Sequence, residues 1–327
     1  MERPAIAPAM IVHGGAGARA LPADRPARKR GLLAALERGA EILRGGGAAI
    51  DAVVAAVTIL EDDPSFNAGY GSVLTAEGRV EMDAAVMTAA RRGRSRATPP
   101  ELRAGGVILI SRVRNPIRLA RAVMELTPHL LMAGAGAERI ARRAGIRLCR
   151  PSEMISPRAR ERWLANRGAI RSAQASGSTA SAFAAEIADR HGTVGAAARD
   201  SHGNLAAATS TGGIPGKLAG RIGDSAIIGA GLFAAARGAA SATGAGEAIM
   251  RAGLCRVAVE ALGPRDPRAA AERALRTLDG AEAGVILVDA HGRLAFAHNA
   301  QAMEIATFSP ADGMRHRTPA PTFVAGR

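Results

Sequence analysis

The sequence changes character at His191-Gly-Thr-Val-Gly-Ala-Ala-Ala198, where a small polar segment gives way to an apolar one. Residues 172–181 are mostly serine, alanine and glycine, a composition typical of a flexible linker. Residues 193–198 predict a β-strand, and a turn at residues 200–204 followed by an apolar run at 205–209 completes a predicted hairpin. The chain therefore enters a strand directly from a linker, with glycine and threonine at the junction.

This junction has a chemical meaning if the chain is cut between Gly192 and Thr193. Thr193 would then carry a free α-amine, whose reference pKa is about 7.7–8.0, beside its own hydroxyl. The amine can accept the hydroxyl proton, directly or through water, and so activate a nucleophile that is otherwise weak. Such general-base help is typically worth about 10²–10⁴ in rate. A single glycine-threonine pair more often just starts a strand, so this hypothesis needs support from the rest of the chain.

Outward from this junction, the sequence predicts a layered α+β fold, because strand-rich and helix-rich stretches follow one another. The elements expected before the linker are a strand at 9–12, helices at about 28–44 and 49–60, a hairpin over 73–82, a strand at 105–111, and two helices within 116–145. The linker is expected to span about 156–192, with at most a short helix at 158–162.

The last third of the chain predicts two helices and one more hairpin. The expected helices cover residues 247–262 and 267–278, and the expected hairpin pairs residues 284–288 with 294–297. Residues from about 309 onward are expected to form a loose tail.

Composition excludes several classes of protein. The 327 residues carry 43 Lys and Arg against 29 Asp and Glu, a net charge of +14. Nearly all of the basic residues are arginines scattered through the chain, and only eight side chains are aromatic, too few for base-stacking platforms. A basic nucleic-acid-binding protein remains an alternative, and the basic loop at residues 91–96 has no assigned role. The length suits about two domains or one large layered domain.

Cysteine and hydropathy patterns favour a cytoplasmic protein. Cys149 and Cys255 fit no metal-ligand or disulfide spacing, which suggests a reducing compartment. Prolines interrupt the first ten residues, so we expect no signal peptide. No apolar run reaches the about 18 residues that a membrane span needs, and the histidines form no helical zinc motif.

Two glycine segments imitate the fingerprint of a dinucleotide-binding turn. One contains Gly15 and Gly17 and the other Gly229 and Gly231. A nicotinamide-dependent oxidoreductase is therefore a second alternative. It is disfavoured because Glu37, at the right distance for a ribose contact, lies within a predicted helix.

A set of motifs resembles the plant-type L-asparaginase/isoaspartyl peptidase family of N-terminal nucleophile (Ntn) hydrolases. The motifs follow one another in the same order as in that family, over roughly Ile11 to Phe296. The matching segments are His13-Gly-Gly-Ala-Gly17, Leu60-Glu-Asp-Asp-Pro-Ser-Phe-Asn-Ala-Gly-Tyr-Gly-Ser-Val-Leu74, Met82-Asp-Ala-Ala-Val-Met87, Met124-Glu-Leu-Thr-Pro-His129, His191-Gly-Thr-Val-Gly-Ala196, Gly203-Asn-Leu-Ala-Ala-Ala-Thr-Ser-Thr-Gly-Gly213, Gly220-Arg-Ile-Gly-Asp-Ser225 and Thr243-Gly-Ala-Gly-Glu247. Glycosylasparaginases and threonine aspartases share the nucleophile logic, and the Arg221/Asp224 pair favours the plant-type branch.

The resemblance implies a four-layer αββα sandwich formed as a precursor that cleaves itself between Gly192 and Thr193. An α subunit of residues 1–192 and a β subunit of residues 193–327 would together form one Ntn-hydrolase domain, and two such αβ units would associate. The expected reactions are release of L-aspartate from β-aspartyl (isoaspartyl) dipeptides and hydrolysis of L-asparagine to aspartate and ammonia. The expected partners are therefore small-molecule substrates and a second copy, with no nucleic acid and no membrane.

The same resemblance implies roles for individual residues. Thr193 would be the nucleophile, Thr211 would orient it, and Thr243 and Gly244 would donate hydrogen bonds to the oxyanion. Substrate would also contact Arg221 through its α-carboxylate and Asp224 through its α-ammonium, a pairing that suits an amino-acid head group on chemical grounds alone. Two further residues are expected to border the substrate: Gly246 and Asn67.

No cofactor is expected to take part in catalysis, but the resemblance implies a structural sodium ion. Its ligands would be backbone carbonyls of Leu60, Glu61, Asp63, Phe66, Ala68 and Tyr70. His13 is interpreted as structural, because the amine of Thr193 already supplies a base.

Overall fold

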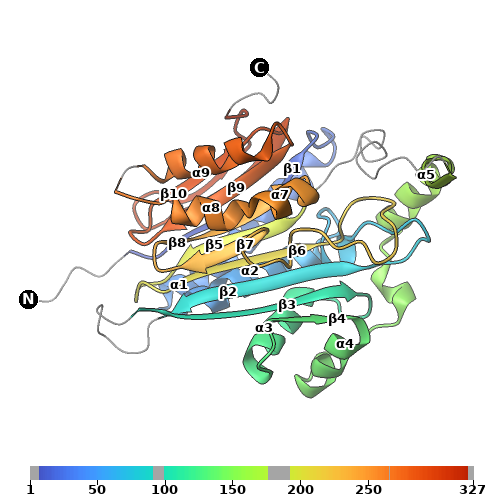
Figure 1. The fold of residues 1–327 in the computed structure, drawn as a ribbon, viewed down its shortest axis with the longest axis horizontal. Coiled ribbons are helices and arrows are strands. Elements are labelled where there is room, and N and C mark those ends of the chain that lie inside the picture. Colours follow the sequence, from blue (N-terminus) through green and yellow to red (C-terminus); the bar gives the residue numbers. More distant parts are fainter. Residues whose placement is uncertain (1–6, 91–98, 176–191, 265, 323–327) are drawn as a thin grey trace, which may run out of the picture.

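The structure, a computed structural model, describes residues 7–90, 99–175, 192–264 and 266–322. Two β-sheets lie face to face between two layers of helices (Figure 1). The larger sheet has the strand order β12-β11-β1-β5-β6-β2-β3-β4, and the smaller has the order β10-β9-β8-β7. The strands of the larger sheet are β1 (Ala9–Gly17), β2 (Met82–Ala90), β3 (Glu101–Ile110), β4 (Leu131–Ala133), β5 (Val194–Arg199), β6 (Leu205–Thr211), β11 (Ala302–Ser309) and β12 (Gly313–Arg317).

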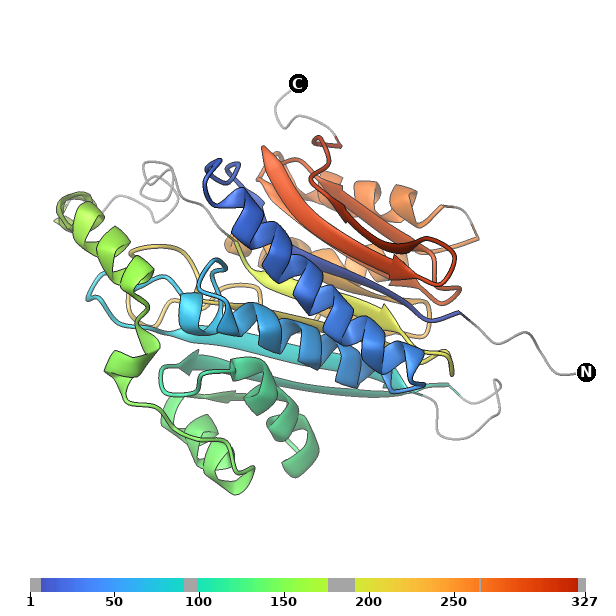
Figure 2. The same ribbon diagram turned by 180° about the vertical axis from the view of Figure 1, so that it is seen from behind.

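The smaller sheet consists of β7 (Leu232–Ala235), β8 (Gly238–Gly244), β9 (Ala283–Asp289) and β10 (Leu294–His298). The helices on the larger sheet's side are α1 (Arg25–Arg44), α2 (Ala49–Asp62), α3 (Pro116–Leu126), α4 (Gly134–Arg143) and α5 (Pro157–Ala175). Figure 2 shows α1 and α2 lying along the back of the larger sheet. The helices on the smaller sheet's side are α7 (Gly246–Ala252), α8 (Leu254–Glu260) and α9 (Pro267–Leu275).

Alternation along the strands produces three separate cores. On β1, Met10 and Val12 pack against the helices, whereas Ile11 faces the smaller sheet. On β9, Ile286 faces the larger sheet and Leu287 faces α8 and α9. The first core lies between α1–α4 and the larger sheet, the second between the two sheets, and the third between the smaller sheet and α7–α9. The predicted αββα sandwich is thereby confirmed.

The first two helices form where the periodicity predicts them. Leu32, Leu36 and Leu43 lie buried on one face of α1, which starts with a proline in its first turn and ends at Gly45. Helix α2 is apolar on most faces because it packs on α1 as well as on β5 and β6.

Several predicted elements differ from the structure. Residues expected in the linker form α5, a helix of 19 residues, so the linker prediction is wrong over Pro157–Ala175. The remainder of the linker, like the basic loop at 91–96, falls outside the described residues. The predicted hairpin over 73–82 is a tight turn without strands, closed by the bond from Thr75 N to Arg79 O at 2.8 Å.

The C-terminal part is more ordered than the sequence predicts. The expected loose tail contains β12, which pairs with β11 along the edge of the larger sheet. The single helix expected over 247–262 is split into α7 and α8 by Gly253, whose φ of +60° is left-handed. Strand β11 and the β7–β8 hairpin were not predicted, because their short apolar runs follow turns and glycines that suggest loops.

Close packing of α3 on β3 depends on a residue without a side chain. A Cβ atom on Gly105 would lie 2.3 Å from the carbonyl oxygen of Ala120 and 2.6 Å from the amide nitrogen of Met124, both on the backbone of α3. Backbone cannot move aside as a flexible side chain can, so this contact sets the distance between the helix and the sheet.

We expect Gly105→Ala to destabilise the protein by about 1–3 kcal/mol, since overpacking forces backbone shifts. The melting temperature should fall by several degrees. Gly168→Ala is the matched control, because that glycine lies in α5 and a methyl group there would meet no atom within 4 Å. Alanine at this position should stabilise the helix by about 0.5–1 kcal/mol. Equal melting temperatures for the two variants would contradict the packing described for α3.

Candidate active site

The candidate site lies where the ends of strands from both sheets meet. Thr193 immediately precedes β5, and the β5–β6 register pairs Val194 with Ser210, so Thr193 lies at the level of Thr211. On the smaller sheet, Thr243 and Gly244 form the end of β8. Antiparallel pairing therefore brings residues that are far apart in the sequence to one place.

Thr193 is buried, and its hydroxyl faces a second hydroxyl. Its Oγ1 lies 3.1 Å from Oγ of Ser225, within hydrogen-bond distance, and only 6% of the residue is exposed. Ser225 is itself held by the hydroxyl of Thr209, which donates to its carbonyl oxygen. Sequence reasoning missed Ser225 as a functional residue. Its place in the Gly220–Ser225 motif, directly after Asp224, was the signal that could have found it.

Thr211 and Asn67 shape the loop beside Thr193. Oγ1 of Thr211 accepts a hydrogen bond of 3.0 Å from the amide of Gly213. Nδ2 of Asn67 donates to the carbonyl of Gly213 at 2.6 Å, and the Asn67 carbonyl accepts from the amide of Gly212 at 3.0 Å. Asn67 therefore ties the loop of residues 66–73 to the end of β6, next to Thr211.

Gly192, the residue before the predicted cleavage site, is packed against Thr243 and β1. In this structure of the uncut chain, a Cβ on Gly192 would lie 2.5 Å from Oγ1 of Thr243 and 3.2 Å from the carbonyl oxygen of Ala16. Oγ1 of Thr243 already accepts a bond of 3.2 Å from the amide of Ala16. The Thr243 hydroxyl therefore lies next to the backbone of both Gly192 and Ala16.

Two other glycines are required at this place. Gly244 has a φ of +139°, and a Cβ there would lie 2.4 Å from the carbonyl oxygen of Glu282. Gly15 has a φ of +116°, and a Cβ there would lie 2.8 Å from the amide nitrogen of Gly192. Side chains at these positions would force the backbone apart.

His13 lies beneath β5 as a neutral side chain. Its Nε2 is 2.8 Å from Oγ of Ser241, and burial lowers its pKa to about 3, partly offset by a hydrogen bond with the backbone of Thr193. A Cβ on Gly195 would lie 2.5 Å from this nitrogen, so the ring packs directly against the strand that carries Thr193. These contacts support the structural interpretation of His13.

Arg221, Asp224 and Gly246 surround one small space. Arg221 binds Oε1 of Glu247 through Nε at 2.9 Å and Nη2 at 2.8 Å. A Cβ on Gly246 would lie 2.8 Å from Oδ1 of Asp224 and 2.9 Å from Nη2 of Arg221, so any side chain there would fill the space. The three predicted substrate-binding residues are thus adjacent.

The carboxyl group of Asp224 is buried, and its Oδ2 has no hydrogen-bond partner within the described parts of the chain. Burial raises its pKa to about 7, although the nearby Arg221 acts in the opposite direction. Ser225, the next residue, contacts Thr193. A buried carboxyl with an unused oxygen at such a place is typical of a ligand-binding site.

In the loop predicted to hold a cation, several backbone carbonyls lie close to Gly69 and Gly71. A Cβ on Gly71 would lie 2.0 Å from the carbonyl oxygen of Phe66 and 3.1 Å from that of Asp63, and one on Gly69 would lie 2.4 Å from that of Glu61. No group of three or more His, Cys, Asp or Glu side chains that could hold a metal occurs among the described residues. Carbonyl oxygens are ligands of hard cations rather than of soft transition metals, so the predicted sodium site stays a prediction. Of the other predicted ligands, Leu60 lies in the last turn of α2, Ala68 accepts from the amide of Gly71, and Tyr70 lies in a short 3₁₀ turn.

The dinucleotide alternative is wrong. Gly15 and Gly17 lie within β1, paired with β11 on one side, and α1 begins only at Arg25. Gly229 and Gly231 lead into β7, which starts a hairpin rather than a helix. Neither segment places a glycine turn against a helix N-terminus, as pyrophosphate binding requires.

None of the helices in the described residues is long and apolar enough to cross a membrane.

Because its pKa is raised, Asp224 should lower the stability of the fold as pH rises. The buried group stays protonated up to about pH 7, whereas in the unfolded chain it ionises near pH 3.8, so stability is lost between these values. We expect Asp224→Asn to melt several degrees higher than the parent at pH 8 and at nearly the same temperature at pH 4. Glu77→Gln, at an exposed position, is the control; a pH-independent difference for Asp224→Asn would refute the buried-carboxyl account.

Comparison with known proteins agrees with this geometry. The sequence model of a family described as asparaginase matches residues 6–316. The chain is 44% identical over 304 residues to the plant-type L-asparaginase of Pyrobaculum calidifontis, covering 90% of this chain and 94% of that protein. It is 42% identical to isoaspartyl peptidase/L-asparaginase of rat (254 residues, 76% and 69%) and of human (252 residues, 76% and 75%). The chain therefore belongs to the asparaginase family of Ntn hydrolases.

Proposed function

We propose that the protein is a self-processing threonine amidohydrolase, which releases L-aspartate from β-aspartyl dipeptides and hydrolyses L-asparagine. The observation that carries this proposal is the position of Thr193. Its buried hydroxyl is within hydrogen-bond distance of the Ser225 hydroxyl, and Gly192 packs against the hydroxyl of Thr243. Asp224, which precedes Ser225 in the chain, and the nearby Arg221 complete a site for an amino-acid head group.

Processing begins with attack of Thr193 Oγ1 on the carbonyl carbon of Gly192. The new C–O bond forms as the C–N bond breaks, and the released nitrogen of Thr193 takes up a proton. Water then hydrolyses the resulting ester, which leaves a carboxylate on Gly192 and a free α-amine on Thr193. The Thr243 hydroxyl, which lies directly beside Gly192, would stabilise the oxyanion.

Hydrolysis of substrate uses the amine that processing creates. The amine accepts the proton of Oγ1, and the oxygen attacks the side-chain amide carbonyl of the bound substrate. The proton then passes to the leaving nitrogen, which departs as ammonia from asparagine or as an amino acid from a dipeptide. Water hydrolyses the acyl ester and releases aspartate. The Thr243 hydroxyl and the Gly244 amide would donate to the oxyanion, and losing one such donor typically costs about 10²–10³ in rate.

Charge complementarity selects the head group. Arg221 would bind the substrate α-carboxylate through its guanidinium. In the structure this guanidinium is paired with Glu247, so the Glu247 carboxylate must move away or bind the guanidinium together with the substrate. Asp224 must be ionised to bind the α-ammonium, so the attraction of the ammonium has to offset the free energy of charging a buried carboxyl. Substrate binding should accordingly strengthen as pH rises through about 7.

Three further properties belong to the proposal. The loop at residues 60–70 would hold sodium through backbone carbonyls, an ion that supports the site structurally and takes no part in catalysis. Two αβ units would associate as a dimer, and the enzyme would work in the cytoplasm. Its two cysteines, Cys149 and Cys255, are free and buried, which is compatible with a reducing compartment.

We expect Thr193→Ala to remain a single band on a denaturing gel and to release neither ammonia nor aspartate. The parent should give two fragments, and N-terminal sequencing of one should start at Thr193. Thr193→Ser is the matched variant, since it retains a hydroxyl and should still be processed. Efficient cleavage of the alanine variant at the same bond would overturn the mechanism.

Ser225→Ala should slow processing by roughly tenfold, because a hydrogen bond to a reacting hydroxyl is worth about 1 kcal/mol or more. The rate is measured from the loss of the uncut band with time. Ser72→Ala provides the control: Ser72 is also buried, and its Oγ has no partner among the described residues. If both variants processed at the parent rate, Ser225 would have no part in orienting Thr193.

A further inference from the structure

A cavity of about 500 Å³ opens beside the predicted cleavage site. Its walls come from the end of β1, the turn that follows, the start of α1 and the ends of β11 and β12. Gly192 and Ala16, which pack against Thr243, form its inner end. A volume of this size accommodates a small molecule.

Three cations that form no ion pair within the described residues line this cavity. Arg19, Arg25 and Lys29 are exposed side chains of its wall, and in the described residues none of them forms an ion pair. Arg25 and Lys29 are four residues apart on α1, a spacing at which like charges repel. The guanidinium of Arg25 is fixed by its bond of 3.0 Å from Nε to the carbonyl of Ala20.

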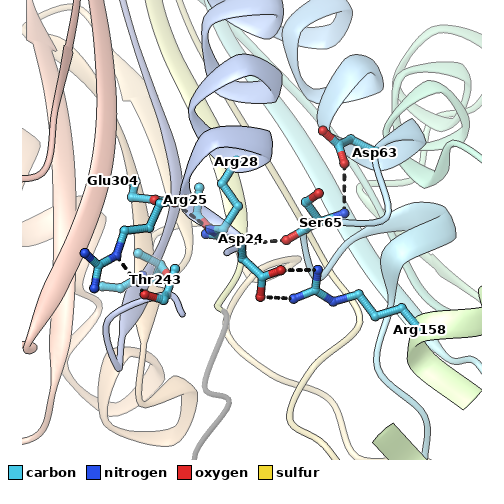
Figure 3. Close-up of polar contacts among 11 residues, drawn as sticks. Asp24, Arg25, Arg28, Asp63, Ser65, Arg158, Thr243 and Glu304 are labelled. Atoms are coloured by element: carbon cyan, nitrogen blue, oxygen red, sulfur yellow. Dashed lines mark hydrogen bonds and ion pairs between the residues drawn. The ribbon is translucent and has the colours of Figure 1, made fainter. Parts of the chain in front are cut away.

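The carboxylate that the described residues contribute to the cavity wall is already paired. Glu304 accepts a bond of 2.7 Å from Nε of Arg28, which also donates to the carbonyl oxygens of Gly14 and Ser65. Figure 3 shows these contacts, with Arg25 and Arg28 leaving the first turn of α1 and Glu304 on the neighbouring strand. The remaining charge of the cavity in the uncut chain is therefore positive. The three cations also outnumber the one carboxylate that processing would leave on Gly192, so the cavity suits an anionic ligand.

The cavity meets the reaction site at a different side from the head-group site. It shares Gly192 and Ala16 with the surroundings of the scissile bond, whereas Arg221, Asp224 and Gly246 are absent from its walls. A substrate with its head group on Arg221 and Asp224, and its reacting carbonyl between Thr193 and Thr243, can thus continue past the reacting bond into the cavity. What lies past that bond in a β-aspartyl dipeptide is the leaving amino acid, which carries a free α-carboxylate.

We propose that this cavity binds the leaving residue of isoaspartyl dipeptides, with Arg19, Arg25 and Lys29 attracting its α-carboxylate. The inference rests on the proposed function and specifies the substrate class that the site prefers. Asparagine has ammonia as its leaving group and gains nothing from these cations. The cavity therefore favours dipeptides with a free carboxyl terminus over asparagine and over dipeptide amides.

The test compares three substrates: β-aspartyl-leucine, the same dipeptide as its carboxyl amide, and L-asparagine. For the fully processed parent enzyme, we expect kcat/KM for the acid to exceed that for the amide, and the ratio to fall with added salt. In the double variant Arg19→Gln/Lys29→Gln, whose side chains are exposed, the ratio of kcat/KM for the acid to that for asparagine should fall about fivefold, through a higher KM. Arg30→Gln, an exposed cation of α1 outside the cavity wall, should leave this ratio unchanged.

Two results would overturn the inference: equal kcat/KM for acid and amide in the parent, or an equal loss for all three substrates in the double variant. In both cases hydrolysis of asparagine would persist, and the proposed function would stand. If the processed parent hydrolysed neither asparagine nor the dipeptides, the proposed function itself would fail.

A Lys29→Glu substitution extends the test. Charge reversal should reduce the ratio of kcat/KM for the acid to that for asparagine further than neutralisation of Lys29 does.

Discussion

The structure depends on the position of β5 in the middle of the larger sheet. This strand pairs with β1 on one side and with β6 on the other, and all six of its residues are buried. Thr193 stands directly before it and is therefore held in place by a strand that is paired on both sides. The neighbours complete the site, since β6 ends at Thr211 and β1 runs past Gly192. Reacting groups held on rigid strands keep their geometry better than groups held on loops.

Close approach of backbones is the second requirement. Gly15, Gly192, Gly195 and Gly244 all lie where a Cβ would meet another atom at less than 3 Å. The gap between the sheets at this end is therefore filled by backbone and small hydroxyl side chains. This packing brings the hydroxyl of Thr243 next to the backbone of Gly192.

The site also contains buried polar groups that lower the stability of the fold. Asp224 and Glu61 are carboxyls whose pKa values burial raises to about 7 and about 8, and each has an oxygen without a partner among the described residues. Their roles differ, because Glu61 accepts bonds from Ser210 and from the amide of Ile117 and so connects α2, β6 and α3. Asp224 has no such network around its Oδ2, and a cationic ligand would satisfy it. A destabilising group kept at this place is consistent with selection for binding rather than for stability.

Local patterns were enough to predict the layered α+β class, the order of the main helices and the junction at Gly192–Thr193, because periodicity and composition are recorded residue by residue. Motif order also led to the family and to Arg221, Asp224 and Thr243. Three features are visible only in the folded molecule: Ser225 lies within hydrogen-bond distance of Thr193, Glu247 rather than Asp224 pairs with Arg221, and cations of α1 line a cavity at Gly192. In the folded molecule, the segment expected to be a tail contains β12, and part of the expected linker forms α5. These features arise from contacts between segments that are distant in the chain. Strand pairing and burial bring those segments together, and local sequence patterns do not encode either of them.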